Sequence, residues 1–330
     1  MPAGPFRLHE GDRPVVGLQR APQGGERGGE PVKILHTAQI HWYNAEVQYA
    51  YDLAEAMAKM GHEVHILTRK NTLSAQVAKE RGFRVFEEDG FNAKGVGFWK
   101  VFAAGHRLKL LLRRERYDAV LVHRPEGLPL IALAGKLTRT PVVRVRGDMR
   151  PVRSDPLNRY VYKKLLSGVV ASNLAIEKNL RERIGGIENL ATIHGGVSLG
   201  EFSDSGPAVD LGREHGFAPD AFLVGLLGRL GEVKGHIDFL DAAKIAYGEN
   251  PRLGFFILAK NLNENAVLRR IKARLEGDSD LQKAVRLVGR QDNLPATLRA
   301  FDLGVIASTG SEANCRVGLE WMACGRPILT

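Results

Sequence analysis

The sequence predicts an α/β fold with two domains, each built on a parallel sheet, that face each other across a cleft. Two observations predict it. Short apolar runs typical of buried strands alternate with helical patterns along nearly the whole chain after residue 30. The alternation is interrupted once, by a loop-like segment at 201–210 (EFSDSGPAVD), and 330 residues suffice for two domains of ordinary size. Because such sheets bind ligands at the carboxyl ends of their strands, the cleft is the expected site.

The first domain is expected at residues 31–205, after an N-terminal extension at 1–30. The extension is rich in Gly, Pro and Arg without apolar periodicity, which indicates disorder or upstream sequence included by a misplaced start. The predicted strands are 32–35, 63–68, 84–86, 119–123, 141–145, 168–172 and 190–193. The predicted helices are 45–60, 105–116, 128–137, 158–166 and 174–183.

The second domain is expected at residues 206–330. The predicted strands are 222–227, 253–258, 285–288 and 303–307, and the predicted helices are 236–247, 263–276, 294–300 and 316–324. Gly325 would end the last helix, with Pro327 just beyond it. A D-x-D pattern at Asp278 and Asp280 lies between predicted elements, where a solvated turn is favoured over a metal site.

The net charge of +10 is concentrated in one region, because residues 100–164 hold sixteen Lys and Arg against five Asp and Glu. Such a field favours a polyanion, an acidic membrane surface or a phosphorylated substrate. No RNA-binding aromatic motif, helix-turn-helix spacing or zinc module accompanies it, so nucleic acid is not an expected partner. The basic amphipathic segment 98–116 is interpreted as a helix packed on the first sheet, and transient contact with an anionic membrane is the alternative.

The location expected from the sequence is the cytoplasm, with peripheral attachment to the cytoplasmic membrane face left open. No apolar run approaches the about eighteen residues of a membrane-spanning helix, and the N-terminus lacks the apolar core of a signal peptide. Cys315 and Cys324 provide neither a disulfide framework nor four metal ligands, so buried free thiols are expected.

Two motifs in the second domain carry the expected chemistry. Gly228, Arg229 and Lys234 follow its first strand and lie just before a helix, where two cations and the first helical N–H groups suit a diphosphate. A surface turn with two solvated charges is the alternative. Glu312 and Glu320 stand eight residues apart across a loop-to-helix junction, about 12 Å if fully helical, so one ligand larger than a sugar could contact both.

The two motifs together resemble the retaining glycosyltransferases of family 4, which have the GT-B fold of two Rossmann-like domains. The matching stretches are GRLGEVKG and SEANCRVGLEWMACGRPIL, preceded in the expected order by AEVQYAYDLAEAMAKMGHEVHILT, YDAVLVHRPEG, NRYVYKKLLSGVVASNLAIEKNL and IHGGVSLGEF. The resemblance covers residues 32–330. It implies an acceptor domain followed by a nucleotide-sugar donor domain.

The resemblance implies that Arg229 and Lys234 neutralise the departing diphosphate, that Glu312 contacts the transferred sugar, and that these three residues are catalytic. Glu320 would bind the ribose, and Arg290 would lie beside the base. The full set implied for the donor is Gly228, Arg229, Lys234, Arg290, Glu312, Asn314, Cys315, Arg316 and Glu320. The acceptor side would include Asn44, Glu46, His123, Arg146 and Asp148, although an edge histidine with a structural role is an equal alternative for His123.

The reaction implied by the resemblance needs no metal and no cofactor, and its donor would be a UDP-, GDP- or ADP-sugar. Retention would follow from attack on the same face as the departing phosphate, which takes the acceptor's proton. The acceptor would be a cell-envelope or lipid-linked glycan. The alternatives are a non-catalytic GT-B protein that binds an anionic glycolipid or a partner, and a sugar-nucleotide epimerase. The donor base, the sugar, the linkage and the oligomeric state stay open.

The sequence departs from the family pattern in four places. The loop 41–46 lacks the usual glycines, Arg146-Gly147-Asp148 replaces a histidine, and Asn314-Cys315 replaces Phe-Gly. Family members also continue past the strand that begins at Pro327. The second sheet is therefore expected to be incomplete and the chain to be a fragment or a truncated reading frame, whose own activity is doubtful.

Overall fold

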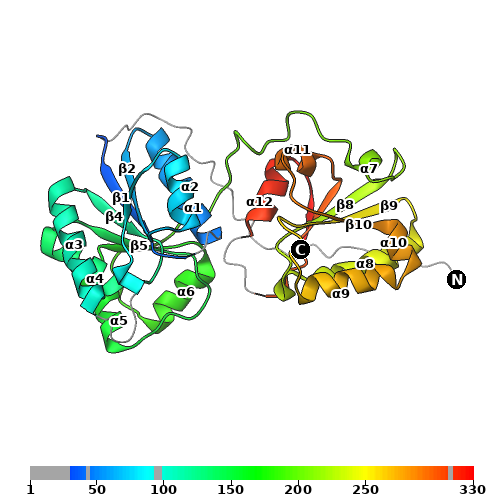
Figure 1. The fold of residues 1–330 in the computed structure, drawn as a ribbon. Helices are drawn as coiled ribbons and strands as arrows, with labels where there is room; N and C mark the ends of the chain where they lie inside the picture. Colours follow the sequence, from blue (N-terminus) through cyan, green and yellow to red (C-terminus); the bar gives the residue numbers. More distant parts are fainter. Residues whose placement is uncertain (1–29, 42–44, 93–98, 311–314) are drawn as a thin grey trace, which may run out of the picture.

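A computed structural model describes residues 30–41, 45–92, 99–310 and 315–330 as two α/β domains side by side (Figure 1). Every paired strand in both sheets is parallel, so each connection must cross a face of its sheet. Helices therefore cover the sheets, and the carboxyl ends of the strands share one edge in each domain. The two-domain α/β fold expected from the sequence is confirmed.

The first sheet has seven strands. In spatial order they are β3 (Arg84–Glu87), β2 (Glu63–Thr68), β1 (Lys33–Ala38), β4 (Ala119–Val122), β5 (Val142–Arg146), β6 (Gly168–Ala171) and β7 (Leu190–Thr192). The helices are α1 (Ala45–Lys59), α2 (Leu73–Glu80), α3 (Trp99–Glu115), α4 (Leu128–Thr138), α5 (Pro156–Tyr160) and α6 (Leu174–Arg183). One core joins α3 and α4 to the sheet, and a smaller one lies under α1.

The second sheet has five strands. In spatial order they are β10 (Val285–Val288), β9 (Leu253–Leu258), β8 (Phe222–Leu227), β11 (Leu303–Val305) and β12 (Ile328–Leu329). The helices are α7 (Leu211–Glu214), α8 (His236–Glu249), α9 (Ala266–Glu276), α10 (Ser279–Ala284), α11 (Leu294–Arg299) and α12 (Arg316–Ala323). Phe256, Phe301 and Trp321 stack edge to face in the core on the side of α11 and α12.

Three local predictions were wrong, each because a short-range contact outweighed the sequence pattern. Helix α3 begins at Trp99 and not at residue 105, which agrees with the interpretation of segment 98–116 as a helix packed on the first sheet. Gly105 lies inside it: a side chain there would meet Leu130 at 3.2 Å, so the glycine allows α3 and α4 to approach closely. Helix α2 was not predicted at all, although Thr72 caps it by accepting from the N–H of Ala75 at 3.2 Å. Asp278 is the N-cap of α10 instead of part of a solvated turn.

The helix expected at 158–166 is split into two pieces. Helix α5 begins earlier, behind the N-cap Asp155, whose carboxylate accepts from the N–H of Asn158 at 3.0 Å. The chain then continues as a π-helical turn at Val161–Leu165, with Val161 and Tyr162 buried in the main core of the first domain. Such turns are usually single insertions into a helix, which apolar periodicity alone does not reveal.

The predicted linker segment 201–210 has no helix or strand but is attached to the second domain. Phe202 is only 2% exposed and packs in the core that contains Trp321. Arg299 donates to the carbonyls of Ser203 at 3.1 Å and Pro207 at 2.9 and 3.1 Å. The segment therefore follows the second domain closely instead of spanning a gap.

Two histidines and an arginine are buried at the centre of the first sheet. His36 of β1 and His123, directly after β4, stack with ring centroids 5.1 Å apart, and their Nδ1 and Nε2 atoms are 3.1 Å apart. Arg144 of β5 is 1% exposed and donates to the carbonyl of Val122 at 2.8 Å. Burial lowers the pKa of His36 to about 3, and burial together with the charges of His36 and Arg144 lowers the pKa of His123 well below its usual value.

This pair predicts that the protein loses stability as the pH falls below 6.5. The unfolded chain binds a proton at each histidine near pH 6.5, whereas folded His36 stays neutral down to about pH 3, so unfolding takes up protons in this window. We expect the free energy of unfolding to fall by roughly 2 kcal/mol per histidine between pH 6.5 and 5. Urea denaturation at a series of pH values measures it. The substitution His36→Gln should make the free energy of unfolding depend less steeply on pH. If the variant shows the same pH dependence as the wild type, the explanation is contradicted.

Candidate functional site

The loop after β8 brings a lysine back over the strand end in the second domain. Gly228 continues the sheet by donating to the carbonyl of Leu258 at 3.0 Å, and a 3-10 turn at Glu232–Lys234 then leads into α8. Lys234 is half-buried, and its side chain lies over Gly228, where a Cβ would be 3.7 Å from it. Arg229 is exposed on the same loop.

This loop meets the loop after β11, so the two motifs separated by about eighty residues in the sequence come together. The N–H of Thr309 donates to the carbonyl of Val233 at 3.0 Å. Lys234, Ser308 and Cys315 line one small recess between the two loops. Burial lowers the pKa of Lys234, the charge of Arg229 lowers it further, and Cys315 opposes both. Lys234 also lies at the N-terminal end of α8, and this end of a helix attracts anions.

Gly235 makes this close approach possible. Its φ is +67°, and a Cβ there would lie 1.8 Å from the carbonyl oxygen of Ala307 in the neighbouring loop. We expect Gly235→Ala to destabilise the protein by more than the about 1–3 kcal/mol of left-handed strain alone, because backbone atoms would also clash. Gly248→Ala is the matched control, since a Cβ at Gly248 of α8 meets nothing within 4 Å. Equal melting temperatures of the two variants would contradict this assignment.

Helix α12 carries the buried carboxylate of the second motif. Glu320 is 5% exposed, and its Oε1 accepts from Nε of Arg316 at 2.7 Å. Burial raises the pKa of Glu320, and Arg316 opposes that shift. Nη1 of Arg316 also donates to Oδ2 of Asp52 in α1 at 2.6 Å, across the boundary between the domains. Figure 1 shows α12 on the side of the second domain that faces the first.

Of the remaining residues predicted to bind the donor, the structure describes Arg290 but not Glu312 or Asn314. Glu312 and Asn314 lie outside the described residues. Arg290 is exposed beyond the carboxyl end of β10, and β9 separates β10 from β8. The structure thus brings together Gly228, Lys234 and Cys315, with Arg229 on the same loop.

A second polar cluster lies at the carboxyl edge of the first sheet. Glu46, in the first turn of α1, accepts a bond from Arg124, which directly follows His123 at the end of β4. Arg124 also donates to Glu126 at 3.0 Å. Gly147, after β5, lies beside them, because a Cβ there would be 3.8 Å from Cγ of Glu46. The loops after β4 and β5 therefore converge on the N-terminus of α1.

The other predicted acceptor-side residues occupy the loop after β5. Arg146 is 7% exposed and donates to the carbonyl of Arg150. Asp148 accepts from the guanidinium of Arg150 at 2.6 Å and from its N–H at 2.9 Å. Burial opposes ionisation of Asp148, but these bonds lower its pKa overall. Asp148 is consequently an anion already paired with a cation in this conformation.

The last two residues predicted for the acceptor side are His123, which is buried, and Asn44, which the structure does not describe. His123 is 2% exposed and bonds to His36, which favours its structural interpretation over direct contact with an acceptor. Asn44 lies outside the described residues. The sequence analysis overlooked Arg124 and Asp52. Arg124 directly follows a predicted strand, so the strand-end rule could have found it, whereas Asp52 in the middle of α1 has no local signal because its partner belongs to the other domain.

The described residues contain no group of three or more His, Cys, Asp or Glu side chains placed to hold a metal ion. Among the helices described, none has the length and apolarity needed to cross a membrane.

Comparison with known proteins adds family evidence to this geometry. The model of Glycosyltransferase Family 4 matches residues 47–201, and the model of Glycosyl transferases group 1 matches residues 221–330. A curated relative is the UDP-Gal:alpha-D-GlcNAc-diphosphoundecaprenol alpha-1,3-galactosyltransferase of Escherichia coli, 25% identical over 235 residues. That match covers 66% of this chain, and the chain spans 59% of the relative's length.

Solved structures share the fold. HepE of Anabaena in complex with UDP has a TM-score of 0.75 at 20% identity, covering 90% of this chain and 79% of HepE. A glycosyltransferase from Rickettsia africae has a TM-score of 0.79 at 14% identity, covering 91% and 79%. The two family matches lie one in each domain and together span most of the chain. The chain therefore belongs to the GT-B glycosyltransferases, with a Glycosyltransferase Family 4 domain followed by a glycosyl transferases group 1 domain.

Proposed function

We propose that the whole protein transfers a hexose from a UDP-sugar to a lipid-linked envelope glycan, with retention of configuration. The observation that carries the donor half is the recess where Lys234 and Cys315 meet at the N-terminal end of α8. Names of relatives support the choice of donor: the relative in E. coli is named for UDP-Gal, and HepE was solved with UDP. GDP- and ADP-sugars are the competing donors.

In this proposal the departing diphosphate binds between Lys234, Arg229 and the first N–H groups of α8. Breaking the bond between sugar and phosphate leaves negative charge on the phosphate, and cations held in place stabilise it without a metal ion. Glu320 binds the ribose hydroxyls with the oxygen that Arg316 does not occupy. Glu312 contacts the transferred sugar. The acceptor hydroxyl attacks from the face of the departing phosphate, which takes its proton.

The acceptor is proposed to bind at the polar cluster of the first domain. Arg124, Glu46 and Asp148 supply both charged donors and charged acceptors of hydrogen bonds at the carboxyl edge of the sheet. Such a mixed set suits the hydroxyls of a sugar, and the nearby cations suit a diphosphate that links it to a lipid. The relative in E. coli is named for an acceptor of this kind.

One experiment tests this function. The whole protein is titrated calorimetrically with UDP, GDP and ADP, and then incubated with the matching sugar nucleotides and a short-chain GlcNAc-diphospholipid. The anomeric configuration of the product is read by NMR. We expect binding of UDP and an α-linked product from an α-linked donor.

The outcomes separate the alternatives. Failure to bind any of the three nucleotides would favour a non-catalytic GT-B protein. Epimerised donor formed without acceptor would favour an epimerase. An inverted product would overturn retention while leaving the transferase intact.

A further inference from the structure

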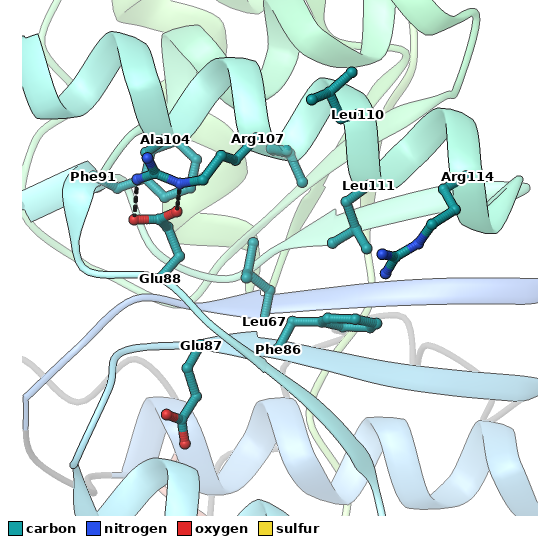
Figure 2. A pocket seen from close by; sticks show the side chains of 11 residues that line it. Leu67, Phe86, Glu87, Glu88, Phe91, Ala104, Arg107, Leu110, Leu111 and Arg114 are labelled. Carbon is teal, nitrogen blue, oxygen red and sulfur yellow. Dashed lines mark hydrogen bonds and ion pairs between the residues drawn. The ribbon is translucent and has the colours of Figure 1, made fainter.

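A cavity of about 350 Å³ opens on the flank of the first domain, between α3 and the edge strand β3 (Figure 2). Figure 1 places α3 on the side of this domain away from the second domain, so the cavity is separate from the site described above. Cavities of this size are typical of small-ligand sites. Among the described residues, β3 is the outermost strand on this side of the sheet, so the cavity lies at the sheet edge.

The walls of the cavity are mainly apolar. Leu67 and Leu108 belong to the domain core, while Phe86 and Leu111 pack against it from the open side. Leu110 lies at the rim and is half exposed. In Figure 2 the side chains of Leu67, Phe86 and Leu111 lie in the space between β3 and α3, and Leu110 lies farther out on α3. The interior therefore suits a hydrocarbon chain better than a sugar or a nucleotide.

Cations line one edge of this cavity. Arg107 and Arg114 of α3 line the cavity and are seven residues apart, which places them along one line of the helix. Arg107 is neutralised by a two-point bond to Glu88 at 2.7 and 2.8 Å. Arg114 is 66% exposed and shares one carboxylate, Glu115, with two other cations. The end of the cavity near Arg114 therefore has an excess of positive charge.

The contacts of Glu115 show how this excess of positive charge arises. Glu115 accepts from Lys33 at 3.0 Å, from Arg84 at 3.1 Å and from Arg114 at 3.1 Å. These partners lower the pKa of Glu115 to about 2. Lys33 also pairs with Glu63 at 3.0 Å, so two carboxylates face three cations, and the two exposed arginines share only Glu115. Their remaining N–H groups can bind an anionic group from solution.

Exposed aromatic residues continue the apolar surface beyond the cavity. Trp99 and Phe102, in the first turn of α3, are 69% and 56% exposed, and their rings lie 6.3 Å apart. Trp99 and Leu110 fall on the same side of the helix, next to the line of cations. Large aromatic residues beside Lys and Arg on a helix are the composition of a helix that lies in a membrane interface.

We propose that the cavity binds one alkyl chain of an anionic membrane phospholipid, with the phosphate on Arg114 and Arg84 and with α3 lying on the bilayer surface. The inference refines the membrane contact that was an open alternative in the sequence, and it rests on α3 and β3 alone. Its test does not depend on sugar transfer, so failure of the one leaves the other standing.

The first experiment measures whether the cavity binds alkyl chains, with soluble amphiphiles as ligands. Hexyl, octyl and decyl phosphate are titrated calorimetrically into the protein below their micelle concentrations. Each methylene that enters an apolar site raises affinity by up to about fourfold, so affinity should rise with chain length. Leu111→Trp fills the cavity and should abolish the dependence on chain length. Arg114→Ala should weaken all three ligands by about fivefold and keep the dependence.

The second experiment asks whether the source of the lipid is a membrane. Flotation with phosphatidylcholine vesicles, with and without phosphatidylglycerol, should recover the protein only with the anionic lipid. Arg114→Ala should weaken this binding about fivefold. Arg252→Ala, which removes a well-exposed arginine of the second domain, should not change it. Alkyl phosphates that bind while anionic vesicles do not would overturn the proposal.

Because Leu111→Trp could impair folding, its melting temperature is compared with that of the wild type. If Leu111→Trp lowers the melting temperature, Leu110→Asp at the exposed rim replaces it and should also abolish the dependence on chain length. Ile245→Asp, on the exposed face of α8, is its matched control. Unchanged binding of decyl phosphate by folded Leu111→Trp or Leu110→Asp would overturn the assignment of the cavity.

Discussion

Replacing Lys234 with alanine is expected to lower kcat by about 100- to 1,000-fold, the usual cost of removing one group that stabilises charge in a transition state. Lys234 is half-buried over Gly228 at the N-terminal end of α8, so its ammonium is held close to the proposed position of the diphosphate. Because burial already lowers its pKa, its removal should not destabilise the fold. Initial rates with UDP-hexose and a lipid-linked acceptor measure the effect in the whole protein.

The matched control is Lys272→Ala. Lys272 lies on the exposed face of α9, with 53% of its side chain accessible. The same loss of charge there should leave kcat unchanged, and melting temperatures of both variants check that each is folded. A folded Lys234→Ala protein with the kcat of the wild type would exclude the diphosphate role.

Replacing Glu320 with glutamine is expected to raise KM for the donor by about 10- to 100-fold. A hydrogen bond to a charged group contributes about 1.5–3 kcal/mol, and the buried carboxylate is the proposed partner of two ribose hydroxyls. Glutamine keeps the shape of the side chain, so the cavity cost of an alanine substitution is avoided. Steady-state kinetics with varied donor give the measurement.

Arg316 makes this test sharper, because it links Glu320 to Asp52 in the other domain. Asp52→Asn weakens that bridge at 2.6 Å but leaves Glu320 in place. If Glu320 binds ribose, Glu320→Gln should raise the donor KM far more than Asp52→Asn. Equal effects of both variants would show that Glu320 acts through the bridge between the domains and not through the nucleotide.

The bridge itself is expected to contribute little to stability. Arg316 and Asp52 are each about one third exposed, at 34% and 38% of their side chains. Ion pairs with that much contact with water are worth roughly 0–1 kcal/mol. The ion pair between Arg316 and Asp52 therefore contributes little to the folding of either domain. Its main effect is on the preferred orientation of the two domains.

Much of the fold was predictable because it depends on local patterns. Strands β2, β8, β9 and β10 and helix α6 have the predicted bounds, since their apolar runs are bounded by turn residues on both sides. Parallel pairing followed from the alternation of strands and helices. The errors at α2, α3 and α10 arose where a cap or a close helix contact, neither visible as periodicity, set the boundary.

The sequence by itself determined the two-domain α/β architecture and placed Gly228, Lys234 and Cys315 near one edge, because parallel strands deliver the loops that follow them to the same end of a sheet. Only the tertiary structure decided which side chains pair. It buried His123 against His36, joined Arg124 to Glu46, and directed Arg316 to Asp52. These contacts join residues from different elements or domains, and their geometry depends on how whole elements pack, which spacing along the chain does not encode.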